Sequence, residues 1–304
     1  MANPDNWPWR ASTLPAVVGR GAVQHQSLDS ALVWFRRDLR AEDNAALHHA
    51  LKAARQVWCV FVYDTEILAA LPRADRRVEF IHASVTDLNR QLECLAAAHG
   101  RSQVRLIVRH GLAAEEIPRL TKTLGVQAVY INHDDEPAAI RRDAKVHASL
   151  RSVGVAVHSY KDHVIFERSE ILTGTGKPYS VFTPYKNAWL KKLEPSFLEP
   201  YPVAPHAGSL APVAPDVAGL PLSLADLGFV PTHLPAMGIT AGSGAAQRLL
   251  DEFMHRIDAY EDTRNLPAVK GPSYLSVHLR FGTVSVRELA RAAGMTPKSL
   301  AKLE

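Results

Sequence analysis

Four charged residues follow the first apolar run of the chain and could bind a polar ligand. The run Leu32–Phe35 is rich in β-prone residues, and it ends directly in Arg36, Arg37, Asp38 and Arg40. A buried parallel strand shows this pattern when its carboxyl end opens onto a ligand crevice. The sequence therefore predicts a polar binding site at the end of this strand.

A second candidate for ligand chemistry, the segment GTGKP at residues 174–178, is excluded. It superficially resembles a phosphate-binding loop. That loop has four residues between its glycines and a Ser or Thr after its lysine. Here one residue separates the glycines and a proline follows the lysine, so a nucleoside triphosphatase of this type is excluded.

The sequence contains no motif for metal binding or for a disulfide framework. The fourteen histidines form no HExxH motif and no pair at metal-ligand spacing, so no metal site is assigned. The two cysteines, Cys59 and Cys94, form neither a disulfide framework nor a metal-binding pattern. Cys59 lies in the apolar run VWCVFV, which favours a small buried core residue.

The composition is that of a globular protein with a substantial core. The chain has 304 residues, of which 47% are hydrophobic, and a net charge of +4. This mild positive charge permits the binding of a polyanion without requiring it. No window approaches the ~18 consecutive apolar residues of a membrane span, and residues 1–30 lack the pattern of a signal peptide. We therefore expect a cytoplasmic protein with no membrane contact.

Apolar strands and amphipathic helices alternate from residue 31 to about residue 160. The clearest helix spans Arg76–Ala98, where apolar side chains recur at steps of three and four and Asp75 is the expected cap. Further helices are expected at Ala113–Leu124, ended by Gly125, and at about residues 136–150. The five expected strands are Leu32–Phe35, Val57–Val62, Arg105–Val108, Ala128–Ile131 and Val155–His158.

Five strands alternating with four helices predict an α/β fold, a doubly wound five-stranded parallel sheet with helices on both faces. The carboxyl edge of such a sheet is the expected ligand site. The residues expected at this edge are Arg36–Arg40, Tyr63–Glu66, Arg109-His110 and Asn132–Glu136.

The sequence predicts four successive parts. Residues 1–30 read as a disordered extension, 31–160 as the α/β domain, 161–242 as an interdomain linker and 243–304 as an incomplete helical domain. The linker is assigned because residues 194–235 are rich in Pro, Gly and Ala and show little periodicity. A helix with one apolar face resumes at about Ser243, and a last helix is expected at about Val284–Ala293.

Three segments resemble the DNA photolyase/cryptochrome family, over roughly residues 31–304. They are VWFRRDLR at 33–40, followed by Asp43-Asn44; FTPYKNAW at 182–189; and YEDTRNLPAVKGPSYLS at 260–276. The resemblance implies a Rossmann-like N-terminal domain that holds an antenna chromophore, followed by a helical domain that holds flavin adenine dinucleotide (FAD).

By this resemblance, the FAD phosphates would be held by Tyr260 and by the turn Ser273, Tyr274, Leu275 and Ser276. Backbone N–H groups and hydroxyls at a helix start capture anions in this way. The family's usual threonine is replaced by Pro272, which removes one hydroxyl and one backbone donor. The alternative interpretation is that Ser273 only caps a helix.

The resemblance also implies contacts with the backbone of damaged DNA through Lys186 and Arg264. Such contacts position a protein on DNA and make its affinity salt-dependent without reading the base sequence. The alternative is that both are ordinary solvated charges, because surface lysines and arginines are common.

The antenna site implied by the family would include Arg36, Asp38, Asp135 and Glu136. Folate-binding members have an Asn-Glu pair where this chain has Ala138-Ala139, so the pattern favours a deazaflavin or another antenna type over folate. The alternative is that these charged residues form only local salt bridges.

The function implied is that of a deoxyribodipyrimidine photo-lyase, a carbon–carbon lyase that uses light and flavin to repair pyrimidine dimers in DNA. The catalytic residues of the family are expected beyond Glu304, so none is named here, and we expect the 304-residue chain alone to be inactive, with an incomplete FAD site. Two alternatives stay open: a blue-light photoreceptor (cryptochrome), and a stand-alone chromophore- or nucleotide-binding α/β module without catalysis. We expect a monomer if the chain folds.

Overall fold

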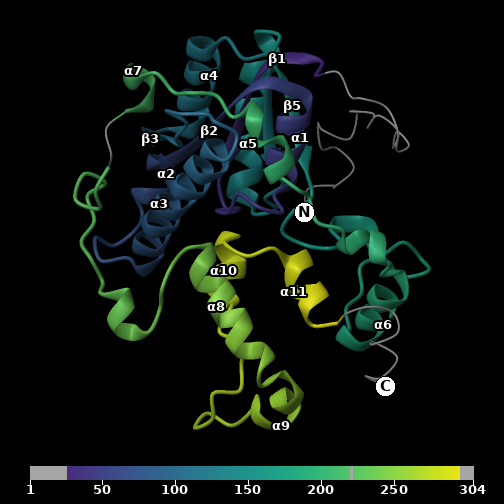
Figure 1. The fold of residues 1–304 in the computed structure, drawn as a ribbon. Helices are drawn as coiled ribbons and strands as arrows, with labels where there is room; N and C mark the ends of the chain where they lie inside the picture. The colour runs from purple at the N-terminus through teal and green to yellow at the C-terminus, as the bar shows by residue number, and fades with distance from the viewer. Residues whose placement is uncertain (1–25, 220–221, 295–304) are drawn as a thin grey trace.

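The computed structural model describes residues 26–219 and 222–294. Its first half is a five-stranded parallel sheet in the order β3-β2-β1-β4-β5 (Figure 1). The strands are β1 (Leu28–Phe35), β2 (Ala54–Asp64), β3 (Ile107–Gly111), β4 (Ala128–Asn132) and β5 (Ala156–Tyr160). The predicted fold class is confirmed. The chain builds outward from β1 to β3 and then returns to β4, so the winding reverses between β1 and β4.

Helices cover both faces of the sheet. Helices α1 (Ala45–Ala53) and α3 (Arg76–Ala97) pack on one face, and α4 (Ala113–Leu124) and α5 (Pro137–Ser152) pack on the other; α2 (Thr65–Leu68) follows β2. Asp75 caps α3 by accepting from the N–H of Arg77, as predicted. Gly125 ends α4 in the left-handed conformation at φ +62°, also as predicted.

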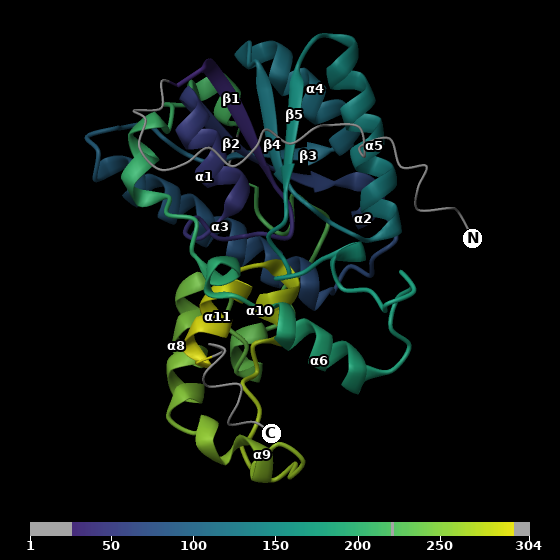
Figure 2. The ribbon, with the colours of Figure 1, turned by 90° about the vertical axis from the view of Figure 1, so that its right-hand side faces the viewer.

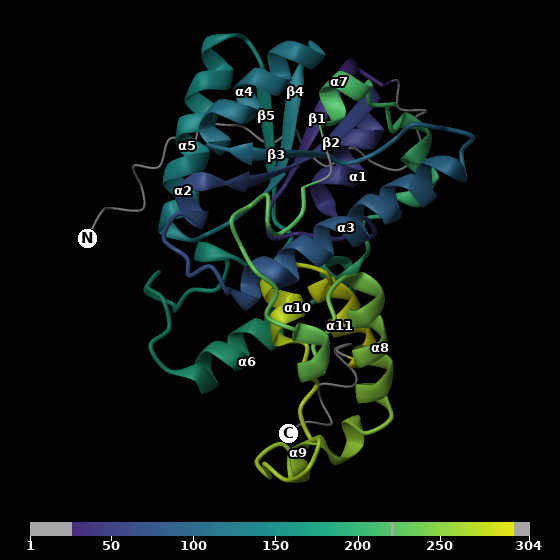
Figure 3. The same cartoon turned by 90° about the vertical axis from the view of Figure 1, so that its left-hand side faces the viewer.

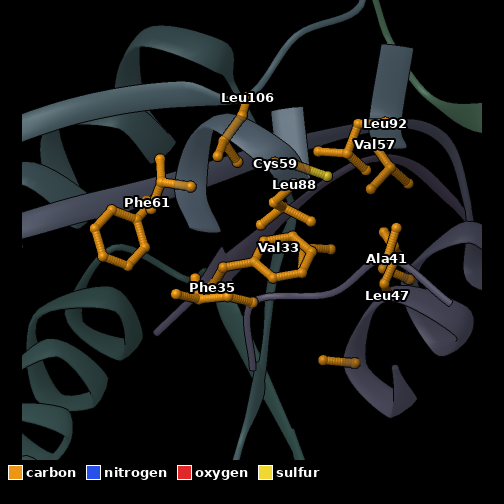
Figure 4. Close-up of a cluster of buried hydrophobic side chains, with 14 of the residues drawn as sticks. Val33, Phe35, Ala41, Leu47, Val57, Cys59, Phe61, Leu88, Leu92 and Leu106 are labelled. Carbon is orange, nitrogen blue, oxygen red and sulfur yellow. The ribbon is translucent and has the colours of Figure 1, made fainter. Parts of the chain in front are cut away.

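The larger core lies between the sheet and helices α1 and α3. Figure 4 shows Val33, Phe35, Cys59, Leu88 and Leu92 converging there, and each is buried. Cys59 is therefore the small core residue that the sequence predicts, and burial raises the pKa of its thiol. This core fixes the carboxyl ends of β1 and β2, where the charged residues begin.

The segment after β5 returns across the α/β domain. Its short elements are η2 (Arg168–Glu170), α6 (Phe182–Lys192), η3 (Pro195–Leu198), η4 (Ala204–Ser209), α7 (Pro215–Ala218) and η5 (Leu234–Met237). Val203, Ala207, Leu210 and Phe229 join the larger core, and the N–H of Ala211 donates to the carbonyl of Val57. The segment read as an interdomain linker thus packs on the sheet domain, although it lacks the periodicity that would reveal a buried face.

The C-terminal helices gather at one end of the α/β domain, with α9 farthest from the sheet (Figures 2 and 3). They are α8 (Ser243–Met254), η6 (Ile257–Ala259), α9 (Tyr260–Thr263), α10 (Ser276–Phe281) and α11 (Val286–Ala292). In the described part of the chain, no helix is long and apolar enough to cross a membrane. Most of the predicted extension 1–30 lies outside the described residues, but β1 already begins at Leu28.

The end of α10 makes close contact with the loop after β1. Gly282 has φ +63°, and a Cβ at this position would lie 2.2 Å from the carbonyl oxygen of Arg37. The N–H of Leu39 donates to the carbonyl of Phe281 at 3.0 Å. Only glycine satisfies both the backbone angle and the approach, so this residue allows α10 to reach the edge of the sheet.

Candidate functional site

A crevice of about 450 Å³ opens at the carboxyl ends of β1, β2 and β4. It lies where the winding of the sheet reverses, which is the usual ligand site of this architecture. Apolar and aromatic side chains form much of its wall, among them Trp34, Phe61, Tyr63, Ile67 and Phe281. The predicted location of the ligand site is therefore a real cavity, of the size that small-molecule ligands use.

The crevice has an excess of positive charge. Seven basic side chains and four carboxylates line it. The basic residues are Arg36, Arg37, Arg77, Arg141, Arg142, Lys145 and Arg280, and the acidic ones are Asp64, Glu66, Asp134 and Glu136. An apolar, aromatic cavity with this charge favours a planar anionic ligand.

Arg36 is held rigidly at the inner end of the crevice. Its guanidinium donates to the carboxylate of Asp143 and to the carbonyl of Asn132. Arg36 and Arg142 both lie 4.9 Å from the ring centroid of Trp34. Burial opposes the charge of Arg36, but Asp143 and Asp38 outweigh it and hold its pKa above the usual value. Arg36 is therefore a fixed cation beside an aromatic wall.

Asp38 has a positioning role and does not line the crevice. It is 2% exposed, and it accepts hydrogen bonds from the N–H of Arg36 at 2.7 Å, from Asn132 Nδ2 at 2.7 Å and from Asn44 Nδ2 at 3.1 Å. Asn44 in turn caps α1. Through these hydrogen bonds Asp38 ties the end of β1 to β4 and α1.

Of the two predicted acidic residues before α5, only Glu136 lines the crevice. Asp135 is exposed and pairs with Arg168 at 2.9 Å. Glu136 pairs with Arg280 at 2.5 Å and with Arg37 at 3.0 Å. The hydrogen bond from Arg280 is the main reason that the pKa of Glu136 lies below its usual value.

A buried ionic cluster docks α10 and α11 against the α/β domain. Asp162 accepts from Arg40 at 2.7 Å and from Arg287 at 2.9 Å, and Asp43 accepts from Arg287 at 2.8 Å and from Ser285 at 2.6 Å. Arg40 also donates to the carbonyl of Gly282. The sequence analysis missed this cluster, because nothing in one sequence pairs residues more than 100 positions apart.

The residues expected to hold FAD phosphates lie beside α8. Tyr260 packs against Phe253 of α8 at 5.6 Å, and Arg256, two residues after the end of α8, donates to the carbonyl of Pro272, next to Ser273. Tyr260 and the 273–276 turn therefore both pack on α8, but at different points: Tyr260 near its C-terminal end, and Leu275 against Ala246 and Leu250. Ser273 Oγ accepts weakly from the N–H of Leu275, and no side chain caps α10 directly.

The described residues alone do not fit a flavin dinucleotide. An apolar cavity of about 280 Å³ lies beside this turn, and Ser273 and Leu275 are the only expected phosphate-site residues that line it. Tyr274 and Ser276 are exposed, and Tyr274 has a left-handed backbone at φ +59°. A dinucleotide needs a larger and more enclosed pocket than this. We therefore derive no chemistry through FAD from these residues.

The two expected DNA-contacting residues are exposed on different elements. Lys186 lies on α6, and Arg264 follows α9 with its guanidinium 5.7 Å from the ring centroid of Tyr260. Among residues 26–219 and 222–294, no group of three or more His, Cys, Asp or Glu side chains could hold a metal ion.

The fold and the crevice together define a class: a doubly wound α/β protein with a ligand site at its switch point and a helical region docked on the same edge. Comparison with known proteins gives the family. The family model for DNA photolyase matches residues 31–206. The chain belongs to the DNA photolyase family.

Relatives and solved structures agree with this assignment. A deoxyribodipyrimidine photo-lyase of Synechococcus sp. is 33% identical, over 86% of this chain and 53% of the relative. A bacterial class III photolyase from Agrobacterium tumefaciens superposes with a TM-score of 0.74 at 25% identity, over 97% of this chain and 58% of that one. An archaeal photolyase from Sulfolobus tokodaii, solved with two FAD molecules, gives a TM-score of 0.69 at 26% identity. This match covers 90% of this chain and 57% of the archaeal one. The chain spans about half the length of the curated photo-lyases that it matches.

Proposed function

We propose that this chain is the chromophore-binding part of a light-driven DNA lyase of the deoxyribodipyrimidine photo-lyase kind. The observation that carries the proposal is the crevice of about 450 Å³ at the switch point of the sheet. It would hold an antenna chromophore between Trp34, Phe61 and the fixed cation Arg36. Bound there, the chromophore would supply the absorption of light.

The residues that line the crevice support a flavin-like or deazaflavin-like antenna. Ala138 and Ala139 line the wall where folate-binding members of the family have an Asn-Glu pair. Their small side chains offer no amide or carboxylate to a folate. The arginines at the inner end and at the mouth suit a ligand with negative charge.

The test is to purify the 304-residue chain, record its absorption spectrum, release the chromophore by denaturation and identify it by mass. The proposal expects about one antenna chromophore per chain, or stoichiometric uptake of a supplied flavin or deazaflavin. A purified chain that carries no pigment and takes up none would contradict it.

Repair by the 304-residue chain alone is not expected, because its phosphate-site residues lie beside a small apolar cavity. The assay is light-dependent loss of cyclobutane dimers from an irradiated oligonucleotide, with added FAD. Stoichiometric FAD retention together with repair would overturn this part of the proposal. Damaged DNA would then be confirmed as a partner, with Lys186 and Arg264 as candidate phosphate contacts.

A stand-alone chromophore-binding module is the second candidate. It is favoured by one observation: Arg280 and Phe281 of α10 line the crevice together with residues of the α/β domain. An antenna pigment without DNA binding would support the module over the lyase. A photoreceptor role shares the same fold, and no residue of the crevice favours it. We further propose a cytoplasmic monomer, which size-exclusion chromatography with light scattering tests for the oligomeric state.

A further inference from the structure

Two arginines share one carboxylate at the mouth of the crevice. Arg37 Nη1 lies 3.0 Å and Arg280 Nη1 lies 2.5 Å from the same oxygen, Oε1 of Glu136. Arg37 Nε also donates to the carbonyl of Arg280 at 3.1 Å. All three side chains line the crevice, and they come from the loop after β1, from α10 and from the start of α5. A single acceptor therefore joins three separate parts of the wall.

This arrangement differs from the inner end of the crevice. There Arg36 is 6% exposed and its carboxylate partner, Asp143, does not line the crevice. At the mouth, about half of the side-chain surface of Arg280 and of Glu136 is exposed to solvent. Arg37 keeps a second partner, Asp134, at 3.2 Å. Arg280 is thus held on the crevice side by Glu136.

The pairing is easily exchanged for a stronger anion. Exposed ion pairs contribute only about 0–1 kcal/mol, because water screens them and both side chains lose rotamer freedom. A phosphate group carries more charge than one carboxylate and accepts from two guanidinium forks at once. Glu136 makes no side-chain cap bond to α5, so its release leaves the helix start intact.

We propose that Arg37 and Arg280 form an anion clamp for a phosphate group of the chromophore, and that Glu136 occupies this clamp until the ligand binds. The clamp selects a planar chromophore that carries a phosphate, such as a flavin mononucleotide, over the same ring without one. This inference rests on the proposed function of the crevice, and it names the class of ligand.

The clamp also links the ligand to the C-terminal helices. Arg280 belongs to α10, and α10 is fixed to the sheet edge by Gly282 and by the Arg40 hydrogen bond to its carbonyl. A phosphate bound by Arg37 and Arg280 would tie these same two parts together. By linkage, docking of α10 strengthens phosphate binding, and bound phosphate stabilises the docked α10.

The experiment compares flavin mononucleotide with riboflavin, which has the same ring without the phosphate, by titration of flavin fluorescence. The variants are Arg280→Gln, Glu136→Gln and the control Arg55→Gln, whose exposed pair with Asp29 lies outside the crevice. Circular dichroism confirms that each variant is folded.

The inference expects the wild type to bind flavin mononucleotide about tenfold more tightly than riboflavin, on the scale of a charge-assisted hydrogen bond. Arg280→Gln should remove most of that difference and leave riboflavin affinity unchanged. Glu136→Gln should tighten flavin mononucleotide alone, and Arg55→Gln should change neither ligand.

Two results would overturn the inference in different ways. Equal affinities for both flavins, unaffected by Arg280→Gln and Glu136→Gln, would refute the clamp while the proposed function stands. Failure of both flavins to bind any form of the chain, with no chromophore recovered from the purified protein, would refute the proposed function and the clamp together.

Discussion

Replacement of Asp162 by Asn should undock the C-terminal helices and destabilise the whole chain. The Asp162 side chain is fully buried and accepts from Arg40 at 2.7 Å, from Arg287 at 2.9 Å and from the N–H of Ala45 at 3.2 Å. The change keeps the size of the side chain but removes its charge. Arg287 then keeps the carboxylate of Asp43, whereas Arg40 keeps the backbone carbonyls of Asp43 and Gly282 and loses its charged partner.

The magnitude follows from the charge that is lost. Burial opposes ionisation of Asp162, but Arg40 and Arg287 outweigh it and hold its pKa at about 2, against 3.8 for the free side chain. That difference corresponds to about 2 kcal/mol of unfolding free energy at neutral pH. The variant also leaves the buried arginines short of a partner, which lowers the unfolding free energy further. The expected total loss is therefore about 3–5 kcal/mol, the usual cost of removing one member of a buried ion pair.

Urea denaturation followed by circular dichroism measures the effect at pH 7. The matched control is Asp29→Asn, which removes the carboxylate of the exposed Asp29–Arg55 pair and should cost less than about 1 kcal/mol. Because the pKa of Asp162 is lowered in the folded chain, the ionised side chain stabilises the fold above pH ~4. This contribution to the unfolding free energy is lost as the pH falls towards 2. The Asn variant should lack this acid dependence. Equal unfolding free energies for Asp162→Asn and Asp29→Asn would refute the reasoning.

Three further predictions follow from single features. Gly282→Ala should destabilise the chain by about 2 kcal/mol or more in urea, because its Cβ meets the loop after β1; the control Gly176→Ala, at φ +74° in open space, should cost only about 1 kcal/mol. Burial lowers the pKa of His49 and of His278 to about 4, so the unfolded chain takes up more protons and the unfolding free energy should fall from pH 6.5 to 4; a flat profile would contradict this. If Lys186 contacts a DNA phosphate, Lys186→Gln should weaken binding to all DNA sequences alike and reduce the salt dependence by about one ion, as measured by fluorescence anisotropy; an unchanged salt slope would mean a solvated surface lysine.

Local patterns predicted the α/β domain well, because each of its elements has its own signal. The apolar run Leu32–Phe35 and the periodic helix after Asp75 both lie where the sequence places them. The location of the crevice also followed from sequence, since parallel strands bring their carboxyl ends to one edge. Arg36 and Glu136 were both expected at this site, and both line the cavity.

The remaining site residues and the burial of the segment after β5 could not be predicted, because they depend on contacts between residues far apart in the chain. Arg280 and Arg287 carry no local motif, yet one lines the mouth of the crevice and the other docks α11. Asp38 was predicted among the antenna residues, with a local role as the alternative, because sequence cannot tell a charged residue that lines a cavity from one that braces its wall. Val203 and Phe229 lie between prolines and glycines without periodicity, so their burial gave no signal.

The most direct test of the central claim is flavin binding by a chain whose crevice has been filled. Ala138 lines the crevice, whereas Ala97 is exposed near the end of α3 and does not. Titration of Ala138→Trp and Ala97→Trp with flavin mononucleotide compares the same substitution inside and outside the site. The account predicts that Ala138→Trp abolishes stoichiometric binding and Ala97→Trp preserves it. Full binding by a folded Ala138→Trp chain would contradict the assignment of this crevice as the chromophore site.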